Sequence, residues 1–410
     1  MGRGITADCR DKIQSDVGAI NAGSGAQLPL EPVRALRLIW RMSHTRYTRL
    51  AQSLPASVPF VGPETQERAR KTPFAARLGA NECVFGPSPL AIKAMQEAVP
   101  DVWMYGDPES YDLRAALAAF HGTRMDNIVV GEGIDGLLGY LARLMIEPGD
   151  CVVTSDGAYP TFNYHVAGFG GVLHKVPYRD DHEDLAALIA RAHDVDAKLI
   201  YFANPDNPMG TWYSGADIRA ALDSLPQGCI LVLDEAYVEC APAGVAAQVD
   251  PHDPRVITMR TFSKGYGMAG ARVGYAIGAP DLIRSFDKIR NHFGMNRISQ
   301  AGALAALADQ AWLAQVTSEI ETARARIGKI AADNVLKTLT SATNFVTIDC
   351  GADGIFAKAV LDGLIAQDIF VRMPFAEPQN RCIRISCGQK ADIDLFAAAL
   401  PKALDHARSD

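Results

Sequence analysis

Four short apolar runs, each followed by a polar or glycine-rich turn, constrain the fold of this chain most strongly. They lie at residues 127–130, 199–203, 229–233 and 256–260, with helix-like stretches between them. Because nearly every side chain in them is apolar, they are typical of strands buried on both faces. We therefore predict an α/β fold with a mostly parallel sheet that helices cover on both sides.

The turns after three of these runs carry the side chains that are best suited to catalysis or ligand binding. These turns are Asn204–Gly210, Asp234–Tyr237 and Thr261–Arg272. Ligands of parallel sheets bind at the carboxyl ends of the strands. We therefore expect Asn207, Asp234 and Lys264 to converge on one site.

Lys264 stands among hydroxyl and glycine residues, and Arg272 follows eight positions later. This arrangement suits an amine that holds an aldehyde cofactor as an imine while an arginine binds the cofactor's phosphate. Burial beside other cations would lower the pKa of Lys264 and free its lone pair. Thr261 and Ser263 would add neutral donors. Taken alone, the segment also fits an ordinary surface turn.

The turn Gly131–Gly136 joins the run 127–130 to a helix that we expect to continue through Met145. A glycine-rich turn between a strand and a helix presents backbone N–H groups and a helix dipole to a phosphate. The same turn fits the G-x-G-x-x-G pattern of dinucleotide folds, with Asp156 placed about 20 residues on as the ribose-binding acid. A nicotinamide-dependent dehydrogenase is therefore an alternative.

Three side chains suit a pyridine-aldehyde cofactor in particular. Asp234 can pair with the ring nitrogen and keep it protonated, so that the ring withdraws electrons from an attached carbanion. Asn207 and Tyr237 can both hydrogen-bond a ring hydroxyl. In isolation each also has a plain explanation, as a helix cap, a turn residue and a core aromatic residue.

These segments together resemble a known family. Their order and spacing are similar to those of the fold-type I, pyridoxal-phosphate-dependent aminotransferases of classes I and II, and within these to the histidinol-phosphate aminotransferase group. The similarity covers roughly residues 56–405 and is carried by Gly131–Asp135, Asn204–Gly210, Asp234–Tyr237 and Thr261–Arg272.

The resemblance implies a large domain with a mostly parallel, seven-stranded type of sheet and a small α+β domain. The large, cofactor-binding domain would span residues 86–319, and the small domain would combine residues 56–85 and 320–410. In the small domain we expect strands at 341–348, 369–372 and 382–386. Residues 1–55 would form a tail, or an arm that wraps a partner subunit.

The resemblance also implies pyridoxal 5′-phosphate as the cofactor, no metal, and a set of site residues. Catalytic roles fall to Lys264, Asp234 and Tyr237. The implied cofactor contacts are Gly133, Ile134, Asp135, Tyr159, Asn207, Asp234, Tyr237, Thr261, Ser263, Lys264, Arg272 and, from the partner subunit of a homodimer with shared sites, Tyr105. The implied substrate contacts are Arg384, which would bind an α-carboxylate, together with Asn344, Arg372 and Asn81.

The implied reaction moves an amino group between an amino acid, or histidinol phosphate, and a 2-oxo acid in a ping-pong cycle. A decarboxylase of the threonine-phosphate type is an alternative. Phe60 stands where the histidinol-phosphate group usually carries a tyrosine, and the turn Gly131–Gly136 also departs from that group's pattern. An aromatic or other amino acid therefore stays open as the substrate. Residues 1–55 are too few and too irregular for the winged-helix module of a transcription regulator.

Composition favours small-molecule chemistry in the cytoplasm. The net charge of −7 suggests neither a nucleic-acid groove nor a membrane surface as a partner. The eight cysteines form no CxxC pair, several lie in apolar runs, and no apolar run is long enough to span a membrane. A helix is plausible from Pro32 to Arg49, and we consider Met42 a candidate start of the biological chain.

Overall fold

The computed structural model describes residues 46–56 and 61–409. The chain divides into two compact units, Met1–Ser53 and Leu54–Asp410. In the described part of the first unit lies the short helix α3 (Arg49–Ser53). The predictions about Met42, the helix from Pro32, most of the tail and Phe60 concern residues outside the described ones.

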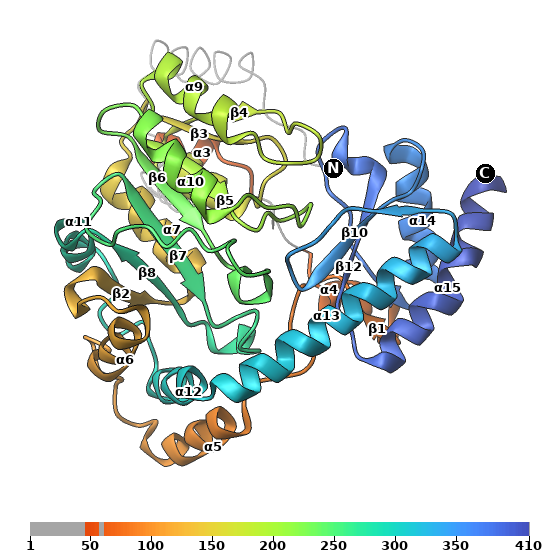
Figure 1. The fold of residues 1–410 in the computed structure, drawn as a ribbon, viewed down its shortest axis with the longest axis horizontal. Helices are drawn as coiled ribbons and strands as arrows, with labels where there is room; N and C mark the ends of the chain where they lie inside the picture. Colours follow the sequence, from red (N-terminus) through yellow and green to blue (C-terminus); the bar gives the residue numbers. More distant parts are fainter. Residues whose placement is uncertain (1–45, 57–60, 410) are drawn as a thin grey trace, which may run out of the picture. The chain divides into compact units, whose positions relative to one another are not determined.

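A seven-stranded sheet dominates the second unit (Figure 1). Its strands, in spatial order, are β2 (Ile128–Gly131), β8 (Gly274–Gly278), β7 (Val256–Thr261), β6 (Ile230–Asp234), β5 (Leu199–Ala203), β3 (Cys151–Ser155) and β4 (Val172–Val176). The strands from β7 to β4 run parallel, and β8 is antiparallel to both of its neighbours. The predicted α/β class with a mostly parallel sheet is confirmed.

Helices cover both faces of this sheet, as Figure 1 shows. They are α7 (Gly133–Met145) and α8 (Thr161–Gly168) on one face and α9 (Leu185–Val195) and α10 (Gly215–Ala221) on the other. Alternate strand residues serve the two sides, since Tyr201 and Met259 pack with α7 while Phe202 and Leu233 pack with α9. This two-sided burial explains why the strands are apolar at nearly every position.

Further helices pack beside β2 and β8. They are α5 (Pro89–Ala98), α6 (Tyr111–His121), α11 (Pro280–Ser285) and α12 (Arg297–Ala308). Ser88 and Pro89 fix the start of helix α5, because the Ser88 hydroxyl accepts the N–H of Leu90 and Pro89 occupies the first turn.

The remaining elements gather around two smaller sheets. One sheet pairs β1 (Ala76–Arg77) with β11 (Ile369–Phe370), and the other has the order β12 (Cys382–Ser386), β10 (Phe345–Asp349), β9 (Lys337–Thr338). The helices are α4 (Pro63–Arg70), α13 (Gln310–Asp333), α14 (Gly354–Ala366) and α15 (Lys390–Ser409). Helices α13, α14 and α15 share one apolar core with strands β1, β10, β11 and β12. The domain boundaries given above stay a prediction.

Two strands of this region are shorter than predicted. The strand expected from Ser341 begins at Phe345, because the hydroxyls of Ser341 and Thr343 both donate to the Phe345 carbonyl and fold the preceding residues into a turn. The strand expected at 369–372 covers Ile369–Phe370. Within the described residues, no helix has the length and apolar character needed to cross a membrane.

Candidate active site

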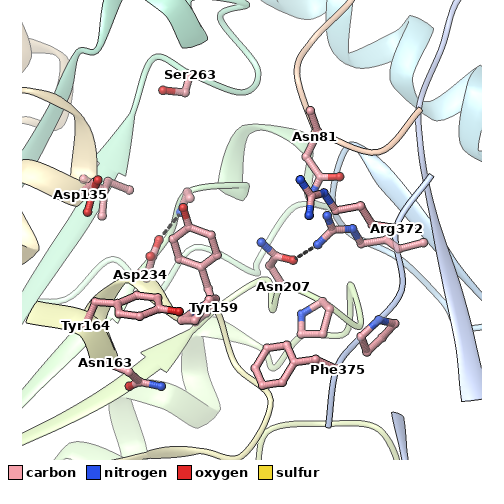
Figure 2. Close-up of a pocket in the computed structure, with 18 of the residues that line it drawn as sticks. Asn81, Asp135, Tyr159, Asn163, Tyr164, Asn207, Asp234, Ser263, Arg372 and Phe375 are labelled. Atoms are coloured by element: carbon pink, nitrogen blue, oxygen red, sulfur yellow. Dashed lines mark hydrogen bonds between the residues drawn. The ribbon is translucent and has the colours of Figure 1, made fainter. Parts of the chain in front are cut away.

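A cavity of about 1100 Å³ opens at the carboxyl ends of β5, β6 and β7. Figure 2 shows Asn207, Asp234 and Tyr159 around this space. The structure brings most of the predicted site residues to its wall: Asn81, Ile134, Asp135, Tyr159, Asn207, Asp234, Tyr237, Thr261, Ser263, Lys264, Arg272, Arg372 and Arg384. They converge because parallel strands end at the same edge of the sheet.

Asp234 is the last residue of β6 and is buried. The hydroxyl of Tyr201 donates to its Oδ2 at 2.6 Å, and the N–H of Ala236 donates to its Oδ1 at 2.9 Å. Burial raises the pKa of Asp234, while these two donors and the nearby Lys264 oppose the rise. Such a carboxyl group, withdrawn from water, suits a partner that brings a proton, such as a basic ring nitrogen.

Lys264 follows β7 and donates from Nζ to the backbone carbonyl of Asn81 at 3.0 Å. Burial lowers the pKa of Lys264, and the positive charges of Arg384 and Arg272 lower it further. A lysine with a lowered pKa has a larger share of free amine near neutral pH. That form is the one that can act as a nucleophile or as a base.

One end of the cavity suits a phosphate. Helix α7 begins at Gly133, whose φ of 76° favours glycine, and a Cβ there would collide with the guanidinium of Arg272. Arg272 donates to the hydroxyl of Ser263 at 3.3 Å and to the carbonyl of Ala269 at 3.1 Å. Because both acceptors are uncharged, the charge of Arg272 and the N–H groups of the helix start can act together on an anion.

The side chains of Thr261, Ser263 and Asp135 form hydrogen bonds at the same end of the cavity. The N–H of Ser263 donates to the Thr261 hydroxyl oxygen at 3.0 Å, and that hydroxyl lies 2.9 Å from the Ser263 hydroxyl. Ile134 and Asp135 contribute the first-turn N–H groups of α7, while the carboxylate of Asp135 lies 2.9 Å from Nε2 of His165. The backbone N–H of Asp135 can therefore bind a phosphate, while its side chain connects α7 to α8.

Asn207 and Tyr237 form the part of the wall that suits a ring oxygen. The Oδ1 atom of Asn207 accepts a hydrogen bond from Arg384, so its Nδ2 must face the other way, where the Tyr237 hydroxyl lies 3.3 Å distant. Both side chains are buried. Burial raises the pKa of Tyr237 to about 12, so the phenol keeps its proton at neutral pH.

Arg372 and Arg384 lie opposite each other across an antiparallel bridge, so their side chains share one side. Among the described residues, Nε of Arg384 is buried without a hydrogen-bond partner. Burial lowers the pKa of Arg384 to about 10, and the charge of Arg372 acts in the same direction. Two guanidinium groups placed together with an unused buried donor suit an anionic part of a ligand.

Three predicted site residues have other surroundings. Gly133 shapes the turn behind Arg272. Asn344 is buried beside the cavity and donates to the Asn81 carbonyl at 3.0 Å. Tyr105 is 77% exposed, away from the cavity, with its ring centroid 4.8 Å from that of Phe293. Tyr105 therefore does not line the cavity of its own chain.

The sequence prediction missed two residues that the site uses. Tyr201 lies within the apolar strand β5 but donates to Asp234, and its signal is that a fully buried tyrosine hydroxyl needs an acceptor. Ser386 bonds both the N–H and the side chain of Asn81. No local pattern could indicate that pair, because 305 positions separate the two residues.

The donor set fits a phosphorylated aromatic aldehyde. It offers a helix start with an arginine for the phosphate, a carboxyl for a ring nitrogen, a phenol for a ring oxygen and an amine for the aldehyde. In the described part of the chain, no cluster of three or more histidine, cysteine or acidic side chains could hold a metal ion.

Comparison with known proteins agrees with this geometry. The family model for aminotransferases of class I and II matches residues 76–400. Histidinol-phosphate aminotransferase 1 of Mesorhizobium japonicum is 34% identical over 80% of this chain and 90% of its own length. The crystal structure of histidinol-phosphate aminotransferase from Sinorhizobium meliloti, in complex with pyridoxal-5′-phosphate, has 53% identity and a TM-score of 0.86 over 89% of this chain and 99% of that one.

Proposed function

This chain belongs to the class I and II aminotransferases, and from that premise we propose that its cavity holds pyridoxal 5′-phosphate and that its amino donor is histidinol phosphate. Lys264 would hold the cofactor's aldehyde carbon, Asp234 its ring nitrogen, and Asn207 and Tyr237 its ring oxygen. The α7 start with Arg272, Ser263 and Thr261 would hold its phosphate, and Tyr159 lies where a ring could stack on it. None of the comparisons favours a dehydrogenase or a decarboxylase.

Different residues of the chain would have different roles in proton transfer. When bound, pyridoxal phosphate supplies a ring that withdraws electrons from the substrate carbon. Lys264 would take the proton from that carbon and deliver it to the carbon that came from the cofactor's aldehyde, since its lowered pKa increases the share of free amine. Asp234 would keep a proton at the ring nitrogen, and Tyr237 would orient the ring. The buried position of these groups limits competition from water.

We base the choice of amino donor on the pair Arg372 and Arg384. Two guanidinium groups on one side of a bridge repel each other, and a phosphate with two negative charges relieves this better than a single carboxylate does. Histidinol phosphate brings such a phosphate, and the named relatives are histidinol-phosphate aminotransferases. The α-carboxylate of a 2-oxo acid acceptor would bind Arg384 in the second half of the cycle.

The test is a half-reaction followed through the absorbance of the bound cofactor. Protein loaded with pyridoxal phosphate is mixed separately with histidinol phosphate, phenylalanine, tyrosine and aspartate. We expect histidinol phosphate to convert the cofactor to its aminated form fastest. In Arg372→Gln we expect its apparent affinity to fall by about 10-fold or more, the loss of one charge-assisted hydrogen bond, with a smaller effect on phenylalanine.

Arg326→Gln is the matched control, because Arg326 lies on α13 and bonds Asp394 outside the cavity. It should leave every half-reaction unchanged. Conversion by the aromatic amino acids alone would overturn histidinol phosphate as the donor, and equal losses for both donors in Arg372→Gln would overturn the role of the arginine pair.

We also propose a homodimer with shared active sites. The segment that carries Tyr105 exposes the large apolar side chains of Val99, Val102, Trp103 and Tyr111, and the exposed ring of Phe293 contacts Tyr105. Exposed apolar groups gathered in one place mark a surface that binds a partner. A second copy would cover them and carry Tyr105 to the neighbouring cavity. The cytoplasmic location stays a prediction from the composition.

A further inference from the structure

Asn81 lies in the loop after β1 and connects more site residues than its sequence position suggests. It is 2% exposed and has a φ of 55°, a left-handed backbone that asparagine tolerates better than most residues do. Its carbonyl accepts hydrogen bonds from Nζ of Lys264 and Nδ2 of Asn344, each at 3.0 Å. The backbone of Asn81 is therefore already fully used inside the protein.

Ser386 fixes which way the side-chain amide of Asn81 points. The Ser386 oxygen accepts the N–H of Asn81 at 3.0 Å, and the single Ser386 proton is then directed to Oδ1 of Asn81 at 2.9 Å. Since Oδ1 serves as this acceptor, Nδ2 must be the atom that faces the Tyr237 hydroxyl, 3.2 Å away. Asn81 therefore donates to Tyr237.

The Tyr237 hydroxyl receives a second hydrogen-bond donor from Asn207. Nδ2 of Asn207 lies 3.3 Å from the same hydroxyl, and its direction is fixed by the hydrogen bond from Arg384 to Oδ1. A phenol oxygen has two lone pairs and one proton. With two amides donating to the oxygen, the proton is what Tyr237 can still offer to a ligand.

We propose that Asn81 is a positioning residue that, with Asn207, commits the Tyr237 hydroxyl to donate its proton to an ionised oxygen on the cofactor ring. This inference rests on the proposed cofactor. It adds a function for a side chain that the sequence placed among the substrate contacts. It also connects strand β12, through Ser386, to the electronic state of the cofactor, because a hydrogen bond to the ring oxygen stabilises its anion.

Asn81→Asp tests the proposal with nearly the same side-chain shape. Its carboxylate would accept the Tyr237 proton and so withdraw it from the ring oxygen. We expect the absorbance titration of the bound cofactor, followed from pH 5 to 10, to move upward by about one pH unit, because one unit is equivalent to a weak charge-assisted hydrogen bond. In a Tyr237→Phe background the same substitution should move the titration by less than half as much.

The double mutant separates a relay through Tyr237 from a direct effect of the new charge. An equal shift in both backgrounds, or no shift in either, would overturn the inference while leaving the proposed cofactor intact. Asn81→Gly keeps the left-handed backbone and the carbonyl without adding charge. It should give a smaller upward shift that also disappears with Tyr237→Phe. If the unmodified protein shows no cofactor absorbance, the proposed function itself fails, and the inference fails with it.

Discussion

At the scale of single residues, the proposed chemistry depends on Lys264, whose pKa is lowered by burial. Lys264→Ala should fold normally and lower turnover by at least about 100-fold, the usual contribution of a positioned general base. Thermal unfolding should stay close to that of the unmodified protein, since the lysine bonds one carbonyl that Asn344 also bonds. Turnover with a steady-state amino donor, and circular dichroism, check the two expectations.

Lys198→Ala is the matched control for this prediction. Lys198 precedes β5 at the opposite end of the sheet and bonds Asp150 at 2.7 Å. Its loss should leave turnover unchanged. Normal turnover in Lys264→Ala would contradict the assignment of the base, whereas an unfolded protein would contradict only the expectation of stability.

The sequence predicted the residues whose chemistry is visible locally. The convergence of Asp234, Asn207 and Lys264 could be predicted because each lies at or shortly after the end of an apolar run, and parallel strands bring such positions together. The bonds that adjust these residues could not be predicted. Tyr201 looks like any strand residue, and the Asn81–Ser386 pair joins a loop to the end of strand β12, which only the fold brings together.

At the scale of elements, a buried acid pair supports the turn Asn204–Gly210. Glu183 and Asp206 are both buried and share a side-chain hydrogen bond, with further donors from Ser155 to Glu183 and from Tyr178 to Asp206. Burial and the charge of Asp206 raise the pKa of Glu183 well above its usual value, and burial raises the pKa of Asp206 to about 6. The pair therefore holds a proton near neutral pH.

This proton makes stability depend on pH with a definite sign. A carboxyl with a raised pKa in the folded state stabilises fully below its unfolded pKa of about 4.3, and that stability is lost as pH rises through the folded pKa. We expect the free energy of unfolding to fall between neutral and alkaline pH. Glu183→Gln, which carries no titrating proton, should lose less stability over this range, as urea unfolding at several pH values would measure.

Glu235→Gln also replaces a buried carboxylate with an amide, but here we expect the substitution to lower stability at neutral pH. Glu235 is buried against Arg260, whose Nη2 lies 2.7 Å from its Oε2. Removal of that charge leaves an unpaired buried arginine and should cost about 3 kcal/mol or more at neutral pH. If both variants respond alike, burial alone and not the partner's charge decides the outcome, and the shared proton is not supported.

Comparison of the observed strands with the predicted ones shows which strands the pattern of apolar residues predicts. β5 and β12 were predicted residue for residue, and the reason for β5 is that its apolar run ends where a polar turn begins. The strand expected from Ser341 starts later, because the hydroxyl groups of Ser341 and Thr343 donate to the backbone carbonyl of Phe345 and fold the preceding residues into a turn. β4 has half-exposed, mixed side chains at the edge of the sheet, and such a strand gives a weak sequence signal.

At the scale of the whole molecule, Trp103 tests the proposed homodimer, because it lies in the exposed apolar segment that carries Tyr105. Trp103 is 79% exposed, so Trp103→Asp should cost a single chain little, whereas the carboxylate would be buried without a partner in a dimer interface. We expect dissociation to become easier by about 30-fold or more, the effect of losing an aromatic anchor. Sedimentation velocity over a range of concentrations measures it. Ile355→Asp, at an 81% exposed position on α14, should leave the assembly unchanged.

Dimerisation alone does not establish that the sites are shared, and a complementation experiment distinguishes the two ideas. If Tyr105 serves the neighbouring cavity, Tyr105→Ala should weaken cofactor retention without changing the assembly. A mixed dimer of Lys264→Ala and Tyr105→Ala chains would then contain one cavity with an intact lysine and an intact partner tyrosine. Random exchange of chains should restore about a quarter of the turnover of the unmodified protein. If exchange is demonstrated by sedimentation and turnover stays at the level of the separate variants, each chain has a site of its own, and the role of Tyr105 across the interface is wrong.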